Sequence, residues 1–404
     1  MANALLTINM ITREAIRLFK NSNAFLMQIN RQYDDQFART GAKIGTALRI
    51  RLPNDYTVTT GPALQVQDTA EQSVGITVAT QKHVDVGFTS IDRSMSLDDV
   101  SERVIAPMVN NLAGAIAADV MSGVEGGVSN LVFNGAISAL TTPVAATFLS
   151  AGAVLNANSA PMGDRKVVQS PYTEAKVVAG LAGLYNPVSD ISKQYRTGHM
   201  GLALGFEWMM DQTTLVHTAG SAATATVSGA SQSGSTLVIS ALSGTLVAGD
   251  IITIAGVNGV NRVTKQDTGQ LQQFVVTANV ANGATSIPIY PAIVPPVSGN
   301  AVQFQTVTAS PANSATVTNI VGASVSYRKN FVFTPEAVTM VTADLYMPEA
   351  GVIESTRMQA DSIAMRFLSD YLPGTDQAVS RLDVLYGYKY IRPEWACVVA
   401  DTLT

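Results

Sequence analysis

The stretch GDIITIAGV at residues 249–257 predicts a β-strand over 251–255. It lies within a block, from Thr218 to Tyr327, that almost lacks charge. The chain has 25 Lys and Arg and 30 Asp and Glu, and the block holds only four of these residues. Ser, Thr, Ala, Gly and Val make up most of the rest, with turn dipeptides such as Asn258-Gly259. So abrupt a change in composition predicts a separately folding insertion inside a host domain.

Short apolar segments recur within this block at roughly ten-residue spacing, which is typical of a small β-barrel or sandwich. The expected strands are 224–228, 236–240, 251–255, 273–277, 286–290 and 302–308. The insertion is therefore predicted to be all-β.

Composition limits the class of protein. At 404 residues the chain is long enough for two or three domains, each with its own core. Only 14% of its residues are charged, whereas about a quarter is usual. Such a chain must bury much of its surface in its own core or against copies of itself, although a large β content would give the same composition. The net charge of −5 disfavours a nucleic-acid reader, which normally shows a basic patch.

Residues that carry chemistry are sparse. The single cysteine, Cys397, excludes an internal disulfide framework, and it is expected to be a small buried apolar residue. The three histidines, His83, His199 and His217, have no second ligand at metal-binding spacing. The sequence has no Gly-rich phosphate loop and no nucleophile elbow. We expect no metal, no cofactor and no enzymatic activity, and also no signal peptide and no membrane span.

The N-terminal part predicts an arm and a long excursion. Residues 3–39 have apolar positions at three- and four-residue steps, so they predict an amphipathic helical arm that must bury its apolar face on another surface. Two strands, 43–52 and 74–91, flank the polar segment 53–73. That segment is far longer than a tight hairpin needs. A long excursion from a compact domain usually has a function or is disordered.

A long helix is predicted from Ser96 to Val124, with a kink or a preceding short helix at Pro107. For a second helix, over 142–155, Thr142 is the expected N-cap and Pro143 the first helical residue. The remaining elements that we expect are a helix at 173–184 and strands at 206–210, 382–390 and 396–399.

This order of elements resembles the HK-97-type fold of tailed-phage major capsid proteins. The resemblance becomes more specific within the insertion, at 249–257, Val260-Asn261 and TGQLQQFVV (268–276), which are similar to the insertion domain of P-22-type coat proteins of short-tailed phages. The segments Leu385-Tyr386-Gly387 and Arg392-Pro393-Glu394 resemble the C-terminal strand of the same family. The further positions that carry the resemblance, in the long helix, are Arg103, Ile105, Leu112, Ala113 and Val120.

The resemblance implies an α+β fold with the parts of such a coat protein and an inserted all-β barrel or sandwich domain (the I-domain). The expected divisions are an N-terminal arm (1–42), an E-loop with its flanking strands (43–92), the spine helix of the P-domain (93–130), the first part of the A-domain (131–217), the I-domain (218–327) and a return through the A- and P-domains (328–404).

The resemblance also implies a function, which is that of a major capsid protein. Copies of the chain would assemble as pentamers and hexamers into an icosahedral shell around phage double-stranded DNA, without sequence-specific binding and without a membrane. A scaffolding protein and a portal would take part in assembly in the bacterial host cytoplasm, and the shell would be the final location. Some relatives cross-link through an E-loop lysine. Because residues 53–81 contain no lysine and Lys82 stands only at the base of the loop, we predict no cross-link.

The candidate residues for contacts between subunits are charged residues of the excursion, its flanking strand and the insertion. They are Arg49, Arg51, Asp55, Asp68, Glu71, Asp250, Arg262, Lys265 and Asp267. For the four in the insertion, the alternative is that they serve the insertion's own turns. The arginines at 49 and 51 could equally form an ordinary strand face.

Two other classes of protein stay open from the sequence. A tail or decoration component, or a surface adhesin, would use the insertion as an Ig-like binding module and would need clustered exposed aromatic residues. The aromatic residues of the insertion are widely spaced, at Phe274, Tyr290, Phe304 and Tyr327. An enzyme with a β-domain insertion would need titratable groups that converge in a cleft, and the sequence suggests none.

Overall fold

The computed structural model describes most of the chain. The described residues are 15, 17–19, 24–31, 47–59, 61–62, 64, 66–67, 71–89, 105–123, 127–180, 201–298, 301–348, 354–360, 363–372, 374 and 377–403. Most of the expected arm, the expected start of the long helix at 96–104 and the candidate residue Asp68 lie outside these residues.

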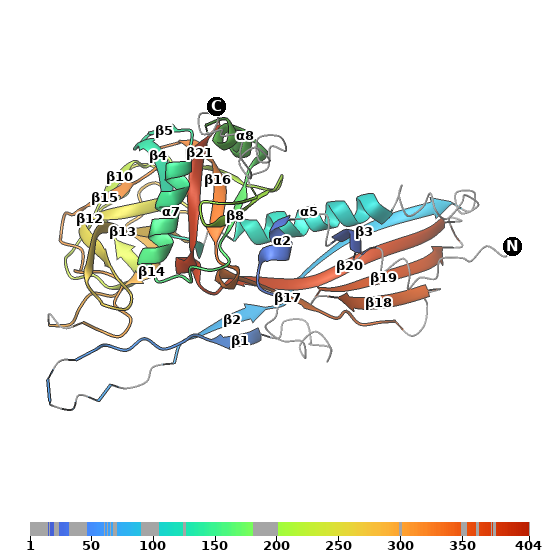
Figure 1. The fold of residues 1–404 in the computed structure, drawn as a ribbon, viewed down its shortest axis with the longest axis horizontal. Coiled ribbons are helices and arrows are strands. Elements are labelled where there is room, and N and C mark those ends of the chain that lie inside the picture. The colour runs from blue at the N-terminus through green and yellow to red at the C-terminus, as the bar shows by residue number, and fades with distance from the viewer. Residues whose placement is uncertain are drawn as a thin grey trace, which may run out of the picture. The chain divides into compact units, whose positions relative to one another are not determined.

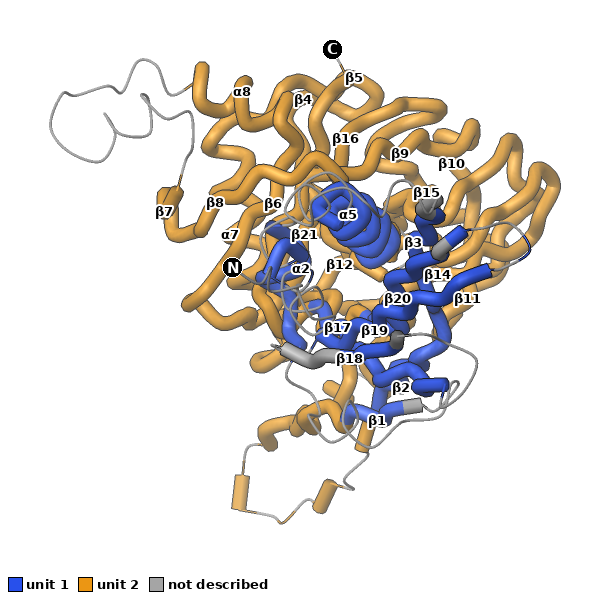
Figure 2. The backbone as a smooth tube through the Cα atoms, turned by 90° about the vertical axis from the view of Figure 1, so that its right-hand side faces the viewer, with its two compact units in different colours: residues 1–50, 73–120, 338–389 blue, residues 51–72, 121–337, 390–404 orange. Residues whose placement is uncertain are grey.

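The chain divides into two compact units, which are coloured separately in Figure 2. Unit 1 comprises residues 1–50, 73–120 and 338–389, and unit 2 comprises residues 51–72, 121–337 and 390–404. Each unit is described by itself below. The domain divisions expected from the sequence stay predictions.

Unit 1 contains a long helix and a five-stranded sheet (Figure 1). The strand order is β17-β20-β19-β18, and β3 pairs with β20 as well. These strands are β3 (Thr80–Thr89), β17 (Val338–Ala343), β18 (Glu354–Ala360), β19 (Ile363–Leu372) and β20 (Gln377–Tyr390). The smaller elements are the short helix α2 (Ala24–Gln28) and a two-stranded sheet of β1 (Ala47–Arg51) and β2 (Ser73–Thr77).

The long helix is α5 (Ala106–Ser122). Pro107 stands in its first turn, where a missing N–H removes no hydrogen bond of the helix. Val109, Leu112, Ile116 and Val120 are fully or almost fully buried, at the three- and four-residue steps that predicted a helix here. The described part of the predicted helix is therefore confirmed.

An eight-stranded sheet forms the part of unit 2 that carries the insertion (Figure 1). Its order is β5-β4-β21-β16-β6-β8-β7, and β9 pairs with β16 as well. The strands are β4 (Leu131–Ala136), β5 (Ala139–Thr141), β6 (Lys166–Gln169), β7 (Leu202–Ala203), β8 (Phe206–Met210), β9 (Val216–Thr218), β16 (Ser326–Phe333) and β21 (Ala396–Thr402). The helices of this part are α7 (Ala145–Ala157) and α8 (Pro171–Gly180).

The helix α7 packs on this sheet through an aromatic contact, with the rings of Phe148 and Trp208 4.6 Å apart. Cys397 of β21 lies in the same apolar cluster, and burial raises the pKa of its thiol. A buried thiol of this kind is a packing residue rather than a nucleophile.

The expected start of α7 was wrong. The N-cap is Val144, and neither Thr142 nor Pro143 is helical. Thr147 explains the shift, because its hydroxyl accepts a hydrogen bond from the Val144 N–H (3.2 Å) and its own N–H donates to the Val144 carbonyl (2.8 Å). An apolar N-cap carries no sequence signal, because the polar partner stands three residues later.

The insertion forms a six-stranded antiparallel sheet in the order β10-β15-β12-β13-β14-β11. Its strands are β10 (Thr224–Thr226), β11 (Gly234–Val238), β12 (Ile251–Val260), β13 (Asp267–Val276), β14 (Ser286–Ile293) and β15 (Thr316–Asn319). A bridge between Val227 and Ile239 joins the two outer strands, with hydrogen bonds from the Ser228 N–H to the Val238 carbonyl and from the Ser240 N–H to the Thr226 carbonyl. The sheet thus closes on itself as a barrel, which leaves no open edge.

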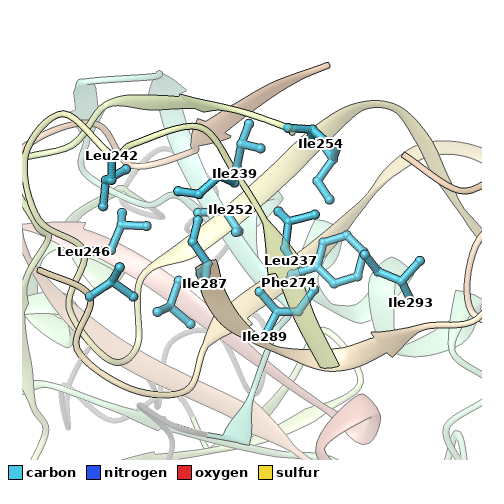
Figure 3. Packing of buried hydrophobic residues seen from close by; sticks show 14 of the residues in the cluster. Leu237, Ile239, Leu242, Leu246, Ile252, Ile254, Phe274, Ile287, Ile289 and Ile293 are labelled. Carbon is cyan, nitrogen blue, oxygen red and sulfur yellow. The ribbon is translucent and has the colours of Figure 1, made fainter. Parts of the chain in front are cut away.

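The barrel is filled by β-branched and leucine side chains around Phe274 (Figure 3). The residues labelled in Figure 3 are Leu237, Ile239, Leu242, Leu246, Ile252, Ile254, Phe274, Ile287, Ile289 and Ile293, and all are at most 3% exposed. This core explains why the insertion needs so little charge, since neutral Ser and Thr suffice at the outward positions of such short strands.

One of the six expected strands was misplaced. Residues 302–308 form turns and a single bridge, between Val307 and Gly259, and the sixth strand is β15 at 316–319. Val307 is fully buried in the barrel core, so the apolar signal was real but came from a loop that folds inward. Burial alone does not separate such a loop from a strand.

A close backbone approach fixes one glycine in β20. A Cβ on Gly387 would lie 2.2 Å from the Thr77 carbonyl oxygen and 3.0 Å from the Val78 Cα, which no side chain can tolerate. The Leu385-Tyr386-Gly387 segment therefore has a packing reason for its glycine.

We predict that Gly387→Ala destabilises the subunit by about 1–3 kcal/mol or more, because the added methyl group collides with backbone. Gly75→Ala is the matched control, since a Cβ there meets nothing within 4 Å. Urea denaturation of both variants measures the difference. Equal stabilities would contradict the packing interpretation.

We also predict that Phe274→Ala lowers the free energy of unfolding by about 3–5 kcal/mol, because it removes a fully buried ring from the barrel. Leu271→Ala on the same strand is the control, because that side chain is 43% exposed and its truncation should cost far less. Thermal unfolding followed by circular dichroism distinguishes the two.

Candidate functional site

The two limbs of the excursion at 53–72 are joined by a backbone hydrogen bond and by the side chain of Gln67. The Leu52 N–H donates to the Gln72 carbonyl at 2.8 Å. Further along, the Gln67 amide pairs with the backbone of Thr57 in both directions, accepting from its N–H (2.9 Å) and donating to its carbonyl (2.5 Å). The side chain of Gln67 thus replaces a partner strand and keeps the two limbs of the excursion together.

Apolar side chains of the excursion face solvent. Tyr56, Val58, Leu64 and Val66 are 54%, 94%, 90% and 81% exposed. Burial of one such aliphatic side chain stabilises by about 1.5–3 kcal/mol, so leaving several bare in one segment is unfavourable in an isolated subunit. Grouped exposed apolar residues mark interaction surfaces.

The candidate charges of the excursion differ in their surroundings. Arg51 and Glu71 form an ion pair at 3.6 Å, with side chains 80% and 58% exposed. Such a pair contributes little, because water screens it. Arg49 is an exposed residue of β1.

Asp55 lies instead in a partly buried group of charges, which we call the Arg262 cluster: Asp55, Arg262, Lys265 and Glu394. The Arg262 Nε donates to both Asp55 oxygens, at 3.0 and 3.2 Å, and its Nη1 donates to Glu394 Oε1 at 2.5 Å. The Lys265 Nζ is 3.7 Å from Asp55. The cluster therefore joins three segments that are far apart in the sequence, all of them in unit 2.

Burial and charge oppose each other in the Arg262 cluster. Burial of the Arg262 guanidinium acts to lower its pKa, but the carboxylates of Glu394 and Asp55 outweigh it, and the pKa is raised. Burial lowers the pKa of Lys265, and the attraction of Asp55 only partly offsets this effect. The nearby phenol of Tyr290 also has a raised pKa, chiefly because the groups packed around it shield it from water, although 36% of the residue remains exposed. Arg262 is thus the firmly charged centre of the cluster.

The loop that carries Arg262 connects β12 to β13 and has several internal hydrogen bonds. Asn261 caps it, since its side-chain oxygen accepts from the N–H groups of Val263 and Thr264, both at 3.0 Å. Its backbone carbonyl accepts from the Lys265 N–H at 2.8 Å, and Lys265 takes a left-handed φ of 58°. A short loop with this many internal hydrogen bonds fixes where Arg262 points.

Asp250 has a different role. It is buried, and one carboxylate oxygen lies 2.9 Å from the His217 Nε2. The other oxygen accepts from the backbone N–H groups of Gly220 (3.0 Å) and Val247 (2.8 Å). Asp250 therefore ties strand β9, where the chain enters the insertion, to the turn that precedes β12, and it holds no exposed charge for a neighbouring subunit.

Asp267 stands at the outer end of the β12–β13 hairpin. Its carboxylate accepts from the Gly269 N–H at 2.7 Å and from the Asn258 side chain at 3.1 Å, and these hydrogen bonds lower its pKa. It serves a turn of the insertion, while its side chain stays exposed.

Sequence reasoning missed two residues of these groups. Glu394 was noted only as part of a family-like segment, and His217 only as an isolated histidine. Both lie far in sequence from their partners, 132 residues from Arg262 and 33 from Asp250. The sequence carried no specific signal for either residue, because both pair through tertiary contacts that no spacing rule reports.

The described residues contain no group of three or more His, Cys, Asp or Glu side chains that could hold a metal ion. No helix within the described ranges is long and apolar enough to span a membrane.

A barrel inserted into a sheet domain, together with an excursion that exposes apolar side chains, defines a subunit built for assembly. The family model described as P22 coat protein (gene protein 5) matches residues 49–399. The chain belongs to the P22 coat protein family. It is thus a major capsid protein that forms the shell of a phage particle with copies of itself, and the expected HK97-type fold with an inserted β-domain is confirmed.

Solved structures with a similar fold include phage capsids. The structure from Mycobacterium phage Che8 is 12% identical to this chain in sequence, with a TM-score of 0.47. The aligned region covers 93% of this chain and 90% of the Che8 chain. The capsid of Ralstonia phage GP4 is 7% identical, with 95% and 92% covered and a TM-score of 0.48. The CUS-3 coat protein I-domain is 31% identical over 24% of this chain and 93% of its own, with a TM-score of 0.19. No curated protein matches the chain.

We predict that Asp250→Ala destabilises the subunit by about 3–5 kcal/mol, because it leaves the buried His217 and the backbone N–H groups of Gly220 and Val247 without this acceptor. Asp267→Ala removes an exposed carboxylate of the same insertion and should change stability by much less. Chemical denaturation of both variants tests this. Similar losses would show that Asp250 is no more important than a surface charge.

Proposed function

We propose that the subunit assembles as pentamers and hexamers of a procapsid, with a scaffolding protein and a portal, in the cytoplasm of the bacterial host. The shell then expands as it takes up double-stranded DNA. The role is structural, with no catalytic step. The observation that carries the proposal is the row of exposed apolar side chains on the excursion, from Tyr56 to Val66.

The simplest partner that could bury this surface is a second copy of the chain. Each subunit would contribute one excursion and receive one, so every apolar side chain would be buried once in a closed shell. Because each contact repeats in every subunit, modest stabilisation per contact suffices to hold the particle together.

The charge of the chain fits a DNA container. A chain with a net charge of −5 does not favour the tight binding to DNA by counterion release that a basic chain would show. We therefore propose that the shell encloses DNA without sequence-specific contacts.

The alternative of an adhesin-like binding module has little support in the insertion. Of the four aromatic residues of the insertion, Phe274 and Tyr327 are buried, so these two cannot contribute to an exposed aromatic face. The absence of a described metal-binding group is compatible with a structural role.

We predict that Val58→Asp with Leu64→Asp leaves the subunit folded but prevents shell formation, because charges replace the apolar contact with the neighbour. Val58→Ile with Leu64→Met keeps the apolar character and should assemble. Sedimentation and negative-stain microscopy of the protein co-expressed with a scaffolding protein measure the outcome. Normal shells from the charged variant, or a wild-type protein that stays monomeric under all conditions, would refute the proposal.

A further inference from the structure

The excursion groups with unit 2, although the strand residues on either side of it, to Ile50 and from Ser73, group with unit 1. Figure 2 shows this division in colour, with the excursion sharing the colour of the insertion. Chain connectivity alone does not explain this grouping. A contact inside unit 2 is needed, and the Arg262 cluster provides one through Asp55.

We propose that the Arg262 cluster is an ionic latch that fixes the excursion to the subunit's own insertion, so that the two move together as one body. Arg262 is then a positioning residue for the excursion. The proposal rests on the proposed function in one respect, which is that the excursion is the segment that reaches a neighbouring copy.

The geometry favours Arg262 as the centre of the latch. Its planar guanidinium bonds Asp55 of the excursion through Nε and Glu394 through Nη1, and a lysine ammonium has no such fixed fork. Two hydrogen-bonded carboxylates on one guanidinium also restrict its rotation, which a single ion pair does not do.

Glu394 and Arg262 each have contacts of their own that do not involve Asp55. Glu394 lies in the short 3₁₀ turn Pro393–Trp395 and is also bonded by the Arg392 Nη1 at 3.2 Å. The Arg392 guanidinium in turn lies 4.9 Å from the centre of the Trp395 ring. At the other end, Asn261 fixes the loop that presents Arg262. A receptor of this kind loses little conformational freedom when it binds Asp55.

The Arg262 cluster is more buried than the other ion pair of the excursion. The side chains of Arg262, Asp55 and Glu394 are 28%, 20% and 24% exposed, against 80% and 58% for Arg51 and Glu71. Water and salt screen the exposed pair strongly and the cluster much less. The Arg262 cluster should therefore control the orientation of the excursion, and the Arg51–Glu71 pair should not.

The latch also assigns a role to the charged residues of the insertion. Of its four charged residues, Arg262 and Lys265 face the subunit's own excursion, Asp250 is buried, and Asp267 caps a turn. These charges thus act mainly within the subunit, and the insertion influences neighbours by setting the direction of the excursion.

The test uses the full-length, unassembled subunit with spin labels on Val58→Cys in the excursion and Leu271→Cys in β13. Both positions are exposed, and the native Cys397 is buried and stays unlabelled. We expect a narrow distribution of label–label distances in the otherwise wild-type protein. Arg262→Gln should broaden it and shift it, and Asp55→Asn should do the same from the other end of the latch.

Two controls separate the latch from general effects of charge. Arg51→Gln removes the exposed ion pair of the same excursion, and Asp267→Asn removes a charge from the same hairpin, so both should leave the distribution narrow. The double variant Asp55→Asn with Arg262→Gln should be no broader than Arg262→Gln alone, because the two residues act through one contact.

Limited proteolysis tests the latch without spin labels, so a label that disturbs the excursion cannot affect the result. Tyr56 follows Asp55 directly and is 54% exposed, so cleavage by chymotrypsin after Tyr56 reports release of the excursion. We expect cleavage about tenfold faster in Arg262→Gln, which corresponds to ~1.4 kcal/mol of lost coupling. Arg51→Gln should be cleaved at the wild-type rate.

The results distinguish the latch from the proposed function. Unchanged distances and cleavage in both Arg262→Gln and Asp55→Asn would overturn the latch, even if the wild-type protein forms shells. A wild-type protein that never forms shells would overturn the proposed function, but a broadened distribution in these variants would still establish the latch.

Discussion

The pairing of β16 with β21 is the interaction on which the completed subunit depends. It runs without a break from Tyr327 opposite Thr402 to Phe333 opposite Ala396, and β16 also pairs with β6 and β9. The strand that leaves the insertion is therefore central to the sheet that carries the insertion. Because β21 comes last in the described chain, this sheet is not complete until β21 pairs with β16 and β4. Such non-local pairing is slow to form. The barrel contains its own strand pairs and core, so it does not wait for that event.

Charged residues are sparse, and several of those that are buried are paired within the subunit. Asp383 is buried between Arg366 and Arg381 in the sheet of unit 1, and Asp401 is buried beside Thr173 and Lys176 in unit 2. A buried carboxylate without partners would be costly, so each of these groups fixes the register of the elements around it.

Much of the fold follows from the sequence, and the exceptions share a cause. The change in composition at Thr218 and Tyr327, the buried steps of α5 and the strands around Ile251 all express local patterns, and local patterns can be read without a structure. The strand expected at 302–308 and the cap expected at Thr142 failed because inward-folding loops and apolar N-caps imitate or hide those patterns. For the site, the sequence singled out Asp55, Arg262 and Lys265 but not their mutual contact. Pairing across 207 residues depends on tertiary structure, and no spacing rule reports it.

The two strands that connect the insertion to the eight-stranded sheet lie side by side, which affects how the fold can vary. Strands β9 and β16 pair where the chain enters and leaves the barrel, and the hydroxyl groups of Thr218 and Ser326 lie 2.8 Å apart. Two chain ends this close could be joined by a tight turn, so the strands that carry the barrel need not move if the barrel is lengthened, exchanged or lost. The barrel is in this sense a separable module, and a fold of this kind can acquire new surface properties by replacing it.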